Sequence, residues 1–127
     1  MNKKIINTTN APKPVGPYSQ AVKARNFLFV SGQGPIDPQT GKIIPDNIEQ
    51  QTIRTLENIK AILNSEGLDF QDVVKVSVFL KDIKNFSKMN DIYGRYFQSD
   101  PPARTTIQAV PPADIEIEID VVASYKD

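Results

Sequence analysis

The sequence predicts an α+β fold in which a mixed β-sheet carries two helices packed on one face. Residues 48–66 and 86–97 have apolar side chains at helical spacing. Strand-like segments with a two-residue apolar period precede, separate and follow these two segments. The order is strands, helix, strand, helix, strand, strand, with no internal repeat, linker or low-complexity tract. Both helices are therefore expected to cover the same face of one sheet.

The first half of the chain contains a predicted hairpin and the first helix. Residues 27–32 are a short apolar run that a glycine closes, and they predict a strand. Residues 20–24 are expected to pair with this strand across a two-residue turn. The first helix is predicted over residues 48–66, and Gly67 is expected to end it.

The second half contains the second helix and three strands. This helix is predicted over residues 86–97, with Asp82 or Asn85 as its cap. Residues 105–110 and 115–124 predict the last two strands. The strand before the helix is expected to have a buried face made of Val74, Val76, Val78 and Leu80.

The composition excludes several classes of chemistry. The 127 residues contain no His, Cys or Trp. Ser-His-Asp and Cys-His nucleophile systems, thiol redox chemistry and His/Cys metal sites are therefore excluded. The sequence also has no calcium-binding loop and no glycine-rich phosphate loop. We expect no metal and no organic cofactor, so catalysis must use carboxylates, Lys, Arg, Tyr, hydroxyls, backbone groups and water.

Charge and hydropathy bound the partners and the location. Lys and Arg number 15, as do Asp and Glu, so the formal net charge is zero and nucleic acid is not expected as a partner. The 39% apolar and 24% charged residues are typical of one globular domain, which we expect over residues 1–127. No window approaches a membrane span, and no apolar segment follows the N-terminal lysines. We expect a soluble cytoplasmic protein that does not bind membranes.

Arg104 is the first candidate for a binding residue. It follows the stiff segment Pro101-Pro102-Ala103 and stands at the start of a β-branched run. Its guanidinium is always charged and offers paired donors that match a carboxylate. The alternative is a surface charge at the start of a strand, and this segment alone favours that alternative.

Glu118 is the second candidate. It alternates with the isoleucines of the last predicted strand, so it points to the uncovered sheet face if the isoleucines pack under the helices. Most acidic strand faces are solvated. This face would also carry large apolar residues from residues 73–81, and wide half-apolar faces are typical of oligomer interfaces. A pocket between subunits that holds Arg104 and Glu118 is therefore a hypothesis.

Seven segments together resemble the Rid family, also called RidA or YjgF. They occur in the family's order and at similar spacing from about Asn10 to the C-terminus, which is far more specific than any single motif. The segments are Gly16-Pro17-Tyr18-Ser19-Gln20-Ala21, Val30-Ser31-Gly32-Gln33, Asn58-Ile59-Lys60-Ala61-Ile62-Leu63, Val76-Ser77-Val78-Phe79-Leu80-Lys81-Asp82, Met89-Asn90, Pro102-Ala103-Arg104-Thr105 and Glu118-Ile119-Asp120.

The resemblance implies a chorismate-mutase-like α+β fold and a homotrimer with its sites between subunits. It also implies a hydrolase, a 2-iminobutanoate/2-iminopropanoate deaminase. Such enzymes convert reactive 2-enamine and 2-imine acids, which pyridoxal-phosphate enzymes release, into 2-keto acids and ammonia. By motif position Arg104 would bind the substrate carboxylate, and Glu118 would position or activate the attacking water. The other residues expected to line the substrate site are Tyr18, Ser31, Asn90 and Thr106.

The sequence departs from the family pattern at several positions. Gly34 stands where the family usually has a larger aliphatic residue, so we expect a wider or looser pocket wall. Thr106 stands where many members have cysteine, and substrate size preference is expected to differ. Asp120 replaces the more usual glutamate, and Glu116 adds a third acid, so either could share the role of Glu118.

Three functional classes remain at this stage. Imine and enamine hydrolysis is the expected function, because a protonated imine is already electrophilic and needs only an anchor, a water and a proton acceptor. A regulatory trimer that binds a carboxylate ligand without turnover would use the same arginine and stays open. An RNA-acting translation inhibitor or ribonuclease is least favoured. The chain lacks histidine and has no basic run interleaved with aromatic residues.

Overall fold

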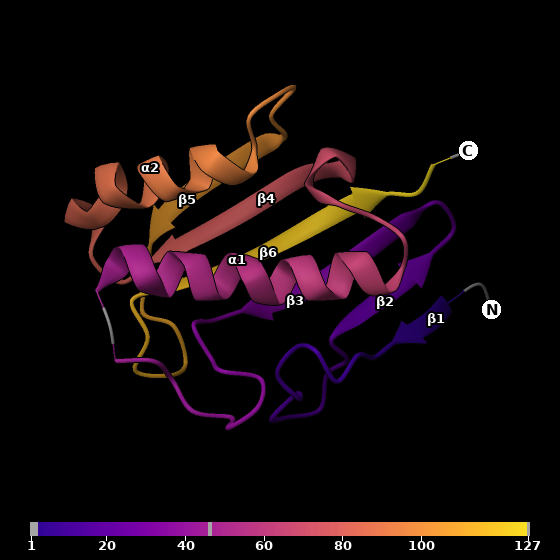
Figure 1. Ribbon diagram of the computed structural model, residues 1–127, viewed down its shortest axis with the longest axis horizontal. Helices are drawn as coiled ribbons and strands as arrows, with labels where there is room; N and C mark the ends of the chain where they lie inside the picture. Colours follow the sequence, from indigo (N-terminus) through magenta and orange to yellow (C-terminus); the bar gives the residue numbers. More distant parts are fainter. Residues whose placement is uncertain (1–2, 46, 127) are drawn as a thin grey trace.

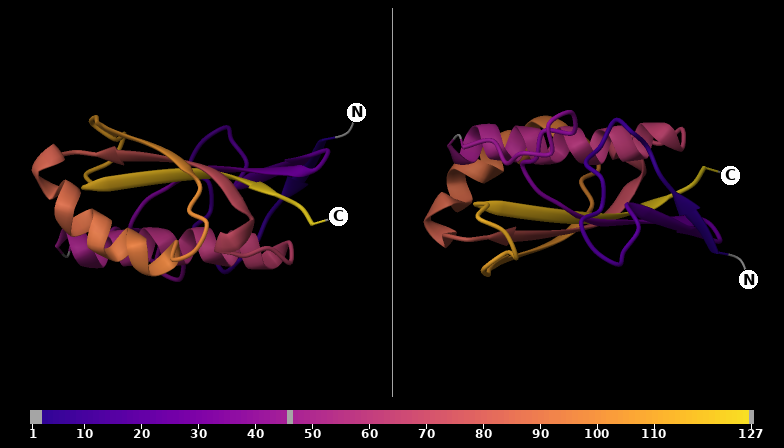
Figure 2. Two further views of the ribbon diagram at one scale, coloured as in Figure 1. Left: turned by 90° about the horizontal axis from the view of Figure 1, so that it is seen from above. Right: turned by 90° about the horizontal axis from the view of Figure 1, so that it is seen from below.

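A computed structural model describes residues 3–45 and 47–126 as a six-stranded sheet with two helices on one face (Figures 1 and 2). The strand order is β1-β2-β3-β6-β4-β5; β4 and β5 are parallel and the other neighbouring pairs are antiparallel. This architecture confirms the predicted mixed sheet. The elements are β1 (Lys3–Ile6), β2 (Ala21–Ala24), β3 (Phe27–Gln33), α1 (Ile48–Ser65), the 3-10 turn η1 (Phe70–Asp72), β4 (Val73–Leu80), the 3-10 turn η2 (Ile83–Asn85), α2 (Phe86–Tyr96), β5 (Ala103–Gln108) and β6 (Ile117–Ser124).

Helix α1 forms the larger part of the helical layer. It begins where the side chain of Asn47 accepts a hydrogen bond from the Gln50 amide at 2.9 Å, which satisfies one of the free N–H groups of the first turn. It ends before Gly67, whose φ of 71° confirms the predicted glycine stop. Its sheet-facing side chains are Leu56, Ile59, Ile62 and Leu63, all 0% exposed.

The centre of the sheet supplies the other half of the core. Along β4 and β6, β-branched side chains alternate with polar ones, and the branched side faces the helices. Burial of each such side chain stabilises the fold by roughly 1.5–3 kcal/mol. The fully or almost fully buried members of these strands are Val76, Val78, Leu80, Ile117, Ile119, Val121 and Ala123.

No helix covers the opposite face of the sheet, as Figure 2 shows. Three large apolar side chains lie on this open face, Phe27, Phe29 and Ile107, and they are 42–48% exposed. The open face is half-apolar as expected, but these three side chains belong to β3 and β5 and not to residues 73–81, which were expected to supply them. None of the helices among the described residues is both long and apolar enough to cross a membrane.

The prediction that Val74 belongs to the buried face of β4 is wrong. The register of β4 against β6 shifts between Val73 and Lys75, which is the signature of a β-bulge. The extra residue moves Val73 to the covered face, where it is 4% exposed, and leaves Val74 44% exposed.

The start of α2 also differs from the expectation. The side chain of Asp82 caps η2 by accepting a hydrogen bond from the Lys84 amide at 2.9 Å. Asn85 occupies the N-cap position of α2 but makes no side-chain capping bond. The sequence analysis did not predict β1, because only Ile6 among its four residues is buried and it shows no alternating pattern.

Asn58 joins α1 to the segment that follows β3. It is 0% exposed, and its Nδ2 donates hydrogen bonds to the carbonyl oxygens of Gly34 (3.0 Å) and Ile36 (2.8 Å). Asn58→Ala removes both bonds and leaves the Ile36 carbonyl without this donor, while the Gly34 carbonyl keeps its bond from the Ile36 amide. We expect the substitution to lower the free energy of unfolding by about 1–3 kcal/mol in urea denaturation. Asn64→Ala, at an exposed position of the same helix, should change it by less than about 0.5 kcal/mol. Equal losses in the two variants would contradict this role for Asn58.

Candidate functional site

The two principal site candidates lie on opposite faces of the sheet. Strand β4 lies between β5 and β6, so the positions of both residues can be compared through their partners on β4. Arg104 of β5 pairs with Val76, and Glu118 of β6 pairs with Phe79. Paired residues of neighbouring strands share a face, and residues an odd number of positions apart on one strand do not. Arg104 therefore points to the helical side, and Glu118 points to the open side.

Arg104 is held between β5 and α2. Its side chain is half-buried, and Nη1 donates a hydrogen bond to Oδ1 of Asn90 at 2.8 Å. The guanidinium carbon lies 4.6 Å from the ring centroid of Tyr93 and 5.5 Å from that of Phe86. One N–H group is thus engaged by Asn90, and the guanidinium offers its other donors to a ligand. The structure brings Arg104 and Asn90 together as the sequence analysis expected, with Asn90 in direct contact with the arginine.

Thr106 lies on the same side of β5, where it pairs with Val78. Among the described residues, neither its buried Oγ1 nor the buried hydroxyl of Tyr93 has a hydrogen-bond partner. A buried hydroxyl without a partner costs about 1–3 kcal/mol, so these atoms mark places where a ligand or a water would be stabilised. Burial raises the pKa of the Tyr93 phenol, and the nearby charge of Arg104 partly opposes this rise.

Glu118 lines a hollow of about 130 Å³ on the open face, together with Phe79 and residues 109–112. A β-carbon added at Gly32 would collide with the Glu118 carboxylate, so this carboxylate would have to move if residue 32 carried a side chain. Burial raises the pKa of Glu118, and the neighbouring negative charge of Asp120 raises it further. A carboxyl group with a raised pKa is a stronger proton acceptor once it is ionised.

Asp120 is the acid closest in environment to Glu118. It lies opposite Ser77 on the open face. Burial raises the pKa of Asp120, while a hydrogen bond from Ser77 and the charge of Lys75 oppose the rise. Two groups thus stabilise the ionised form of Asp120. No such group is among the causes of the pKa shift of Glu118.

Ser31 and Tyr18 lie near one another through the segment that precedes β2. The hydroxyl of Ser31 donates to the carbonyl oxygen of Ser19 at 2.6 Å, and the Ser31 amide donates to Gln20 at 2.9 Å. Buried Gln20 in turn binds the backbone of residues 8–12. These bonds fix the loop that presents Tyr18, whose side chain is 49% exposed and whose hydroxyl accepts a hydrogen bond from the Val15 amide. Ser31 thus bonds to backbone and joins its strand to the Tyr18 loop.

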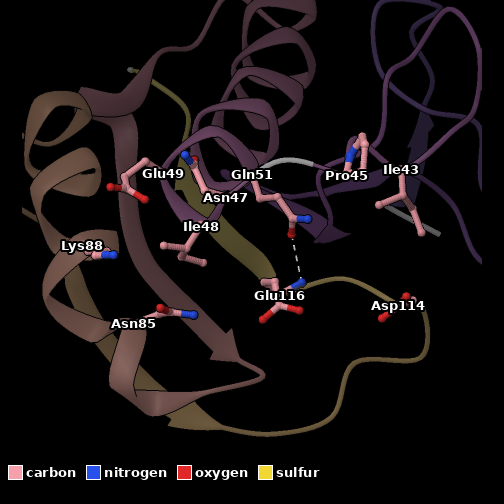
Figure 3. Close-up of a pocket in the computed structure, with 10 residues that line it drawn as sticks. All are labelled: Ile43, Pro45, Asn47, Ile48, Glu49, Gln51, Asn85, Lys88, Asp114 and Glu116. Atoms are coloured by element: carbon pink, nitrogen blue, oxygen red, sulfur yellow. Dashed lines mark hydrogen bonds between the residues drawn. The ribbon is translucent and has the colours of Figure 1, made fainter.

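A hollow of about 670 Å³ lies elsewhere, at the N-terminal end of α1. Glu116 lines this hollow, and its amide donates to Oε1 of Gln51 at 2.9 Å (Figure 3). Its carboxylate lies 3.8 Å from Nζ of Lys81. None of the six site candidates lines this hollow, and Glu116 does not line the hollow of Glu118. Across residues 3–45 and 47–126, no group of three or more His, Cys, Asp or Glu side chains could hold a metal ion.

The expectation that Gly34 widens a pocket wall is wrong. A β-carbon added at Gly34 would lie 3.0 Å from Cδ1 of Ile115. The side chain of Ile115, which is 3% exposed, already occupies the space that a larger residue would fill. A side chain at position 34 would therefore have to displace Ile115.

Sequence analysis missed the contributions of Gly32 and Tyr93. Tyr93 was assigned only to the apolar face of the second helix. It lies three residues after Asn90, however, and this spacing places both side chains on one face of a helix. Gly32 follows the apolar run of β3, where a glycine in a strand often marks a close approach of another group. Both signals were present in the sequence.

The structure thus places an arginine and a carboxyl group with a raised pKa on opposite faces of one sheet. The family described as Endoribonuclease L-PSP matches residues 8–125. A RutC family protein of Pyrococcus horikoshii is 53% identical over 98% of this chain and 99% of its own length. The chain belongs to this family, which is the Rid or YjgF family that the motifs indicated.

Two further relatives extend the comparison. Reactive Intermediate Deaminase A, chloroplastic, from Arabidopsis thaliana is 41% identical over 98% of this chain and 67% of its own length. The crystal structure of E. coli TdcF with bound serine has a TM-score of 0.91 and 38% identity, and the match covers 97% of this chain and 99% of that chain. The fold of this chain is thus the family fold.

The raised pKa of Glu118 gives a prediction that needs no assay of activity. Asp120→Asn removes a neighbouring negative charge that favours the protonated form, so it should lower the pKa of Glu118. Carbon-13 NMR of the labelled glutamate carboxyl groups, assigned with Glu118→Gln, measures this pKa. Asp114→Asn is the matched control, because the Asp114 side chain is 91% exposed and should leave the pKa unchanged. An unchanged or higher pKa in Asp120→Asn would contradict the coupling of the two acids.

Proposed function

We propose that this protein hydrolyses reactive 2-imino and 2-enamine acids to 2-keto acids and ammonia at sites between the subunits of a homotrimer. The observation that carries the proposal is the placement of a fixed arginine and a carboxylate with a raised pKa on opposite faces of one sheet. Within one chain the sheet itself separates them. Arg104 of one copy can face Glu118 of another copy, and both then serve one substrate.

The open sheet face supports assembly. It combines the exposed side chains of Phe27, Phe29 and Ile107 with the Glu118 hollow. Contact between copies removes this apolar surface from water, which stabilises an oligomer. The number of three subunits comes from the resemblance to the family.

Arg104 would bind the carboxylate of the substrate. A guanidinium forms two parallel N–H···O bonds with a carboxylate, and Asn90 fixes its orientation before the substrate arrives. A small-molecule acid anchored in this way presents its C2 atom at a defined distance from the subunit boundary. The 2-keto acid product retains the carboxylate, so it should bind to the same group.

Glu118 would activate the attacking water. Its carboxylate accepts a proton as the water oxygen forms a bond to C2 of the protonated imine. Glu118 then gives this proton to the nitrogen of the resulting carbinolamine, and the C–N bond breaks with release of ammonia. C2 forms a carbonyl as the hydroxyl proton passes to the Glu118 carboxylate and from there to solvent. Water and imino acid thus yield the keto acid and ammonia, and no covalent nucleophile takes part.

The relatives support a small amino-acid-like ligand. The plant relative is named as a reactive intermediate deaminase, and the TdcF structure contains serine, which carries the same carboxylate as the proposed substrates. The bound serine also favours a second candidate, a protein that binds such acids without turnover. The family description names an endoribonuclease, but this chain has no histidine for acid–base chemistry on RNA.

A coupled assay tests the proposal. Threonine dehydratase releases 2-iminobutanoate, and addition of this protein should accelerate the formation of 2-ketobutyrate. Arg104→Ala should lose both 2-ketobutyrate binding, measured by calorimetry, and turnover, and Arg104→Lys should rescue poorly. Glu118→Gln should still bind 2-ketobutyrate while hydrolysis falls by roughly a hundredfold. Arg95→Ala, at an exposed arginine of α2, is the matched control and should behave as wild type.

Each contrary result has a defined meaning. Binding of 2-ketobutyrate without acceleration by the wild type would favour the binding protein. Near wild-type turnover in Glu118→Gln would transfer the water-activating role to Asp120 or to backbone groups. Near wild-type binding in Arg104→Ala would remove the carboxylate anchor. Cleavage of RNA by the wild type, abolished by the same two substitutions, would favour the endoribonuclease.

A further inference from the structure

Arg104 needs more than one contact to stay oriented. An arginine side chain loses about 2 kcal/mol of rotamer entropy when it is fixed, and β5 is an edge strand with one neighbour. Asn90 supplies one hydrogen bond, which restrains one nitrogen of the guanidinium but leaves its plane free to rotate about that bond. A second contact must therefore define the plane.

The ring of Tyr93 provides that contact. The guanidinium carbon lies 4.6 Å from the ring centroid, within the range of a cation–π interaction. Tyr93 is only 7% exposed, so the interaction is shielded from water. The Tyr93 hydroxyl has no hydrogen-bond partner among the described residues. Burial raises the pKa of this hydroxyl and the closeness of Arg104 opposes the rise, so Tyr93→Phe separates the contribution of the ring from that of the hydroxyl.

The ring of Tyr93 is itself immobilised by aromatic neighbours. It stacks on Phe97 with centroids 4.4 Å apart and an interplanar angle of 29°. Phe97 in turn meets Phe70 of η1 edge-on, with centroids 5.1 Å apart and an angle of 80°. A chain of three packed rings therefore connects the guanidinium to the core beneath α1 and α2.

We propose that Tyr93 is a positioning residue that sets the plane of the Arg104 guanidinium through its ring face. Only the expected effect of Tyr93 on ligand binding rests on the proposed function. The contact between ring and guanidinium can be measured without any ligand, so the two proposals fail in distinguishable ways.

NMR of the arginine side chains tests the contact directly. The chain has four arginines, Arg25, Arg54, Arg95 and Arg104, so the guanidinium signals of the labelled protein are few. Arg104, assigned with Arg104→Lys, should show an upfield ring-current shift and a rigid N–H vector. Tyr93→Leu should remove most of the ring-current shift and the rigidity, leaving only a smaller shift from Phe86, whose ring centroid lies 5.5 Å from the guanidinium carbon. Tyr93→Phe should retain both features. If Tyr93→Leu does not fold, Tyr93→Met removes the ring with a flexible side chain of similar size.

Binding of 2-ketobutyrate tests the consequence. Tyr93→Leu should bind about tenfold more weakly than wild type, while Tyr93→Phe should bind within about twofold. Tyr96→Leu is the matched control. Tyr96 belongs to the same helix and meets Phe70 edge-on at 5.2 Å, but it bonds to Glu57 instead of contacting Arg104. It should leave both binding and the Arg104 signal unchanged.

Two results would overturn the inference. One is an Arg104 signal in wild type without a ring-current shift, which would place the guanidinium away from the ring. The other is equal weakening of binding by Tyr93→Leu and Tyr96→Leu, which would assign the effect to general loss of packing. A wild-type protein with the shifted signal but no affinity for 2-ketobutyrate would contradict the proposed function and leave the positioning role of Tyr93 supported.

Discussion

The alternation of side chains along β-strands decides how this protein can use its two charged site residues. With α1 and α2 on one face only, each step along β4, β5 or β6 moves a side chain from the helical side to the open side. Arg104 and Glu118 pair with positions of β4 that are three residues apart, Val76 and Phe79. The sheet therefore separates the two side chains within one chain.

This separation gives the two residues different surroundings. Arg104 lies against aromatic rings and Asn90, where contacts within the chain fix its direction. Glu118 lies in a shallow hollow beside Gly32, and burial together with Asp120 raises its pKa. The proposed function assigns carboxylate binding to the arginine and proton acceptance to the glutamate. In the proposed oligomer, the helical side of one chain meets the open face of another, so Arg104 and Glu118 from two chains share one site.

The sequence predicted the parts of the fold that depend on local patterns. The apolar spacing of residues 48–66 and the glycine after them defined α1, because amphipathic helices and glycine stops are local features. The assignment of Val74 to the buried face failed because a bulge depends on pairing with β6, whose partner residues Val122 and Ala123 lie far along the chain. Strand β1 was missed because its burial depends on β2 and not on its own pattern.

The site shows the same limit. The motifs indicated Arg104, Asn90 and Thr106. In the structure Arg104 and Thr106 belong to β5, and Asn90 of α2 bonds to Arg104. No motif indicated that Arg104 and Glu118 would lie on opposite faces, because that depends on the register of three strands. The hydrogen bond from Arg104 to Asn90 could not be predicted from the sequence either, because it depends on the packing of α2 over β5.

Mixed oligomers test the central claim, that one site uses Arg104 and Glu118 from different chains. Arg104→Ala and Glu118→Gln chains, each expected to be nearly inactive alone, are co-expressed with different tags and isolated as mixed assemblies. Random assembly in equal amounts makes about a quarter of the subunit boundaries carry both intact residues, so hydrolysis should recover to about a quarter of the wild-type rate. Mixed assemblies of wild-type chains with doubly substituted chains are the control. If the two single variants show no recovery while this control shows about half of the wild-type rate, both residues act within one chain, and the account is contradicted.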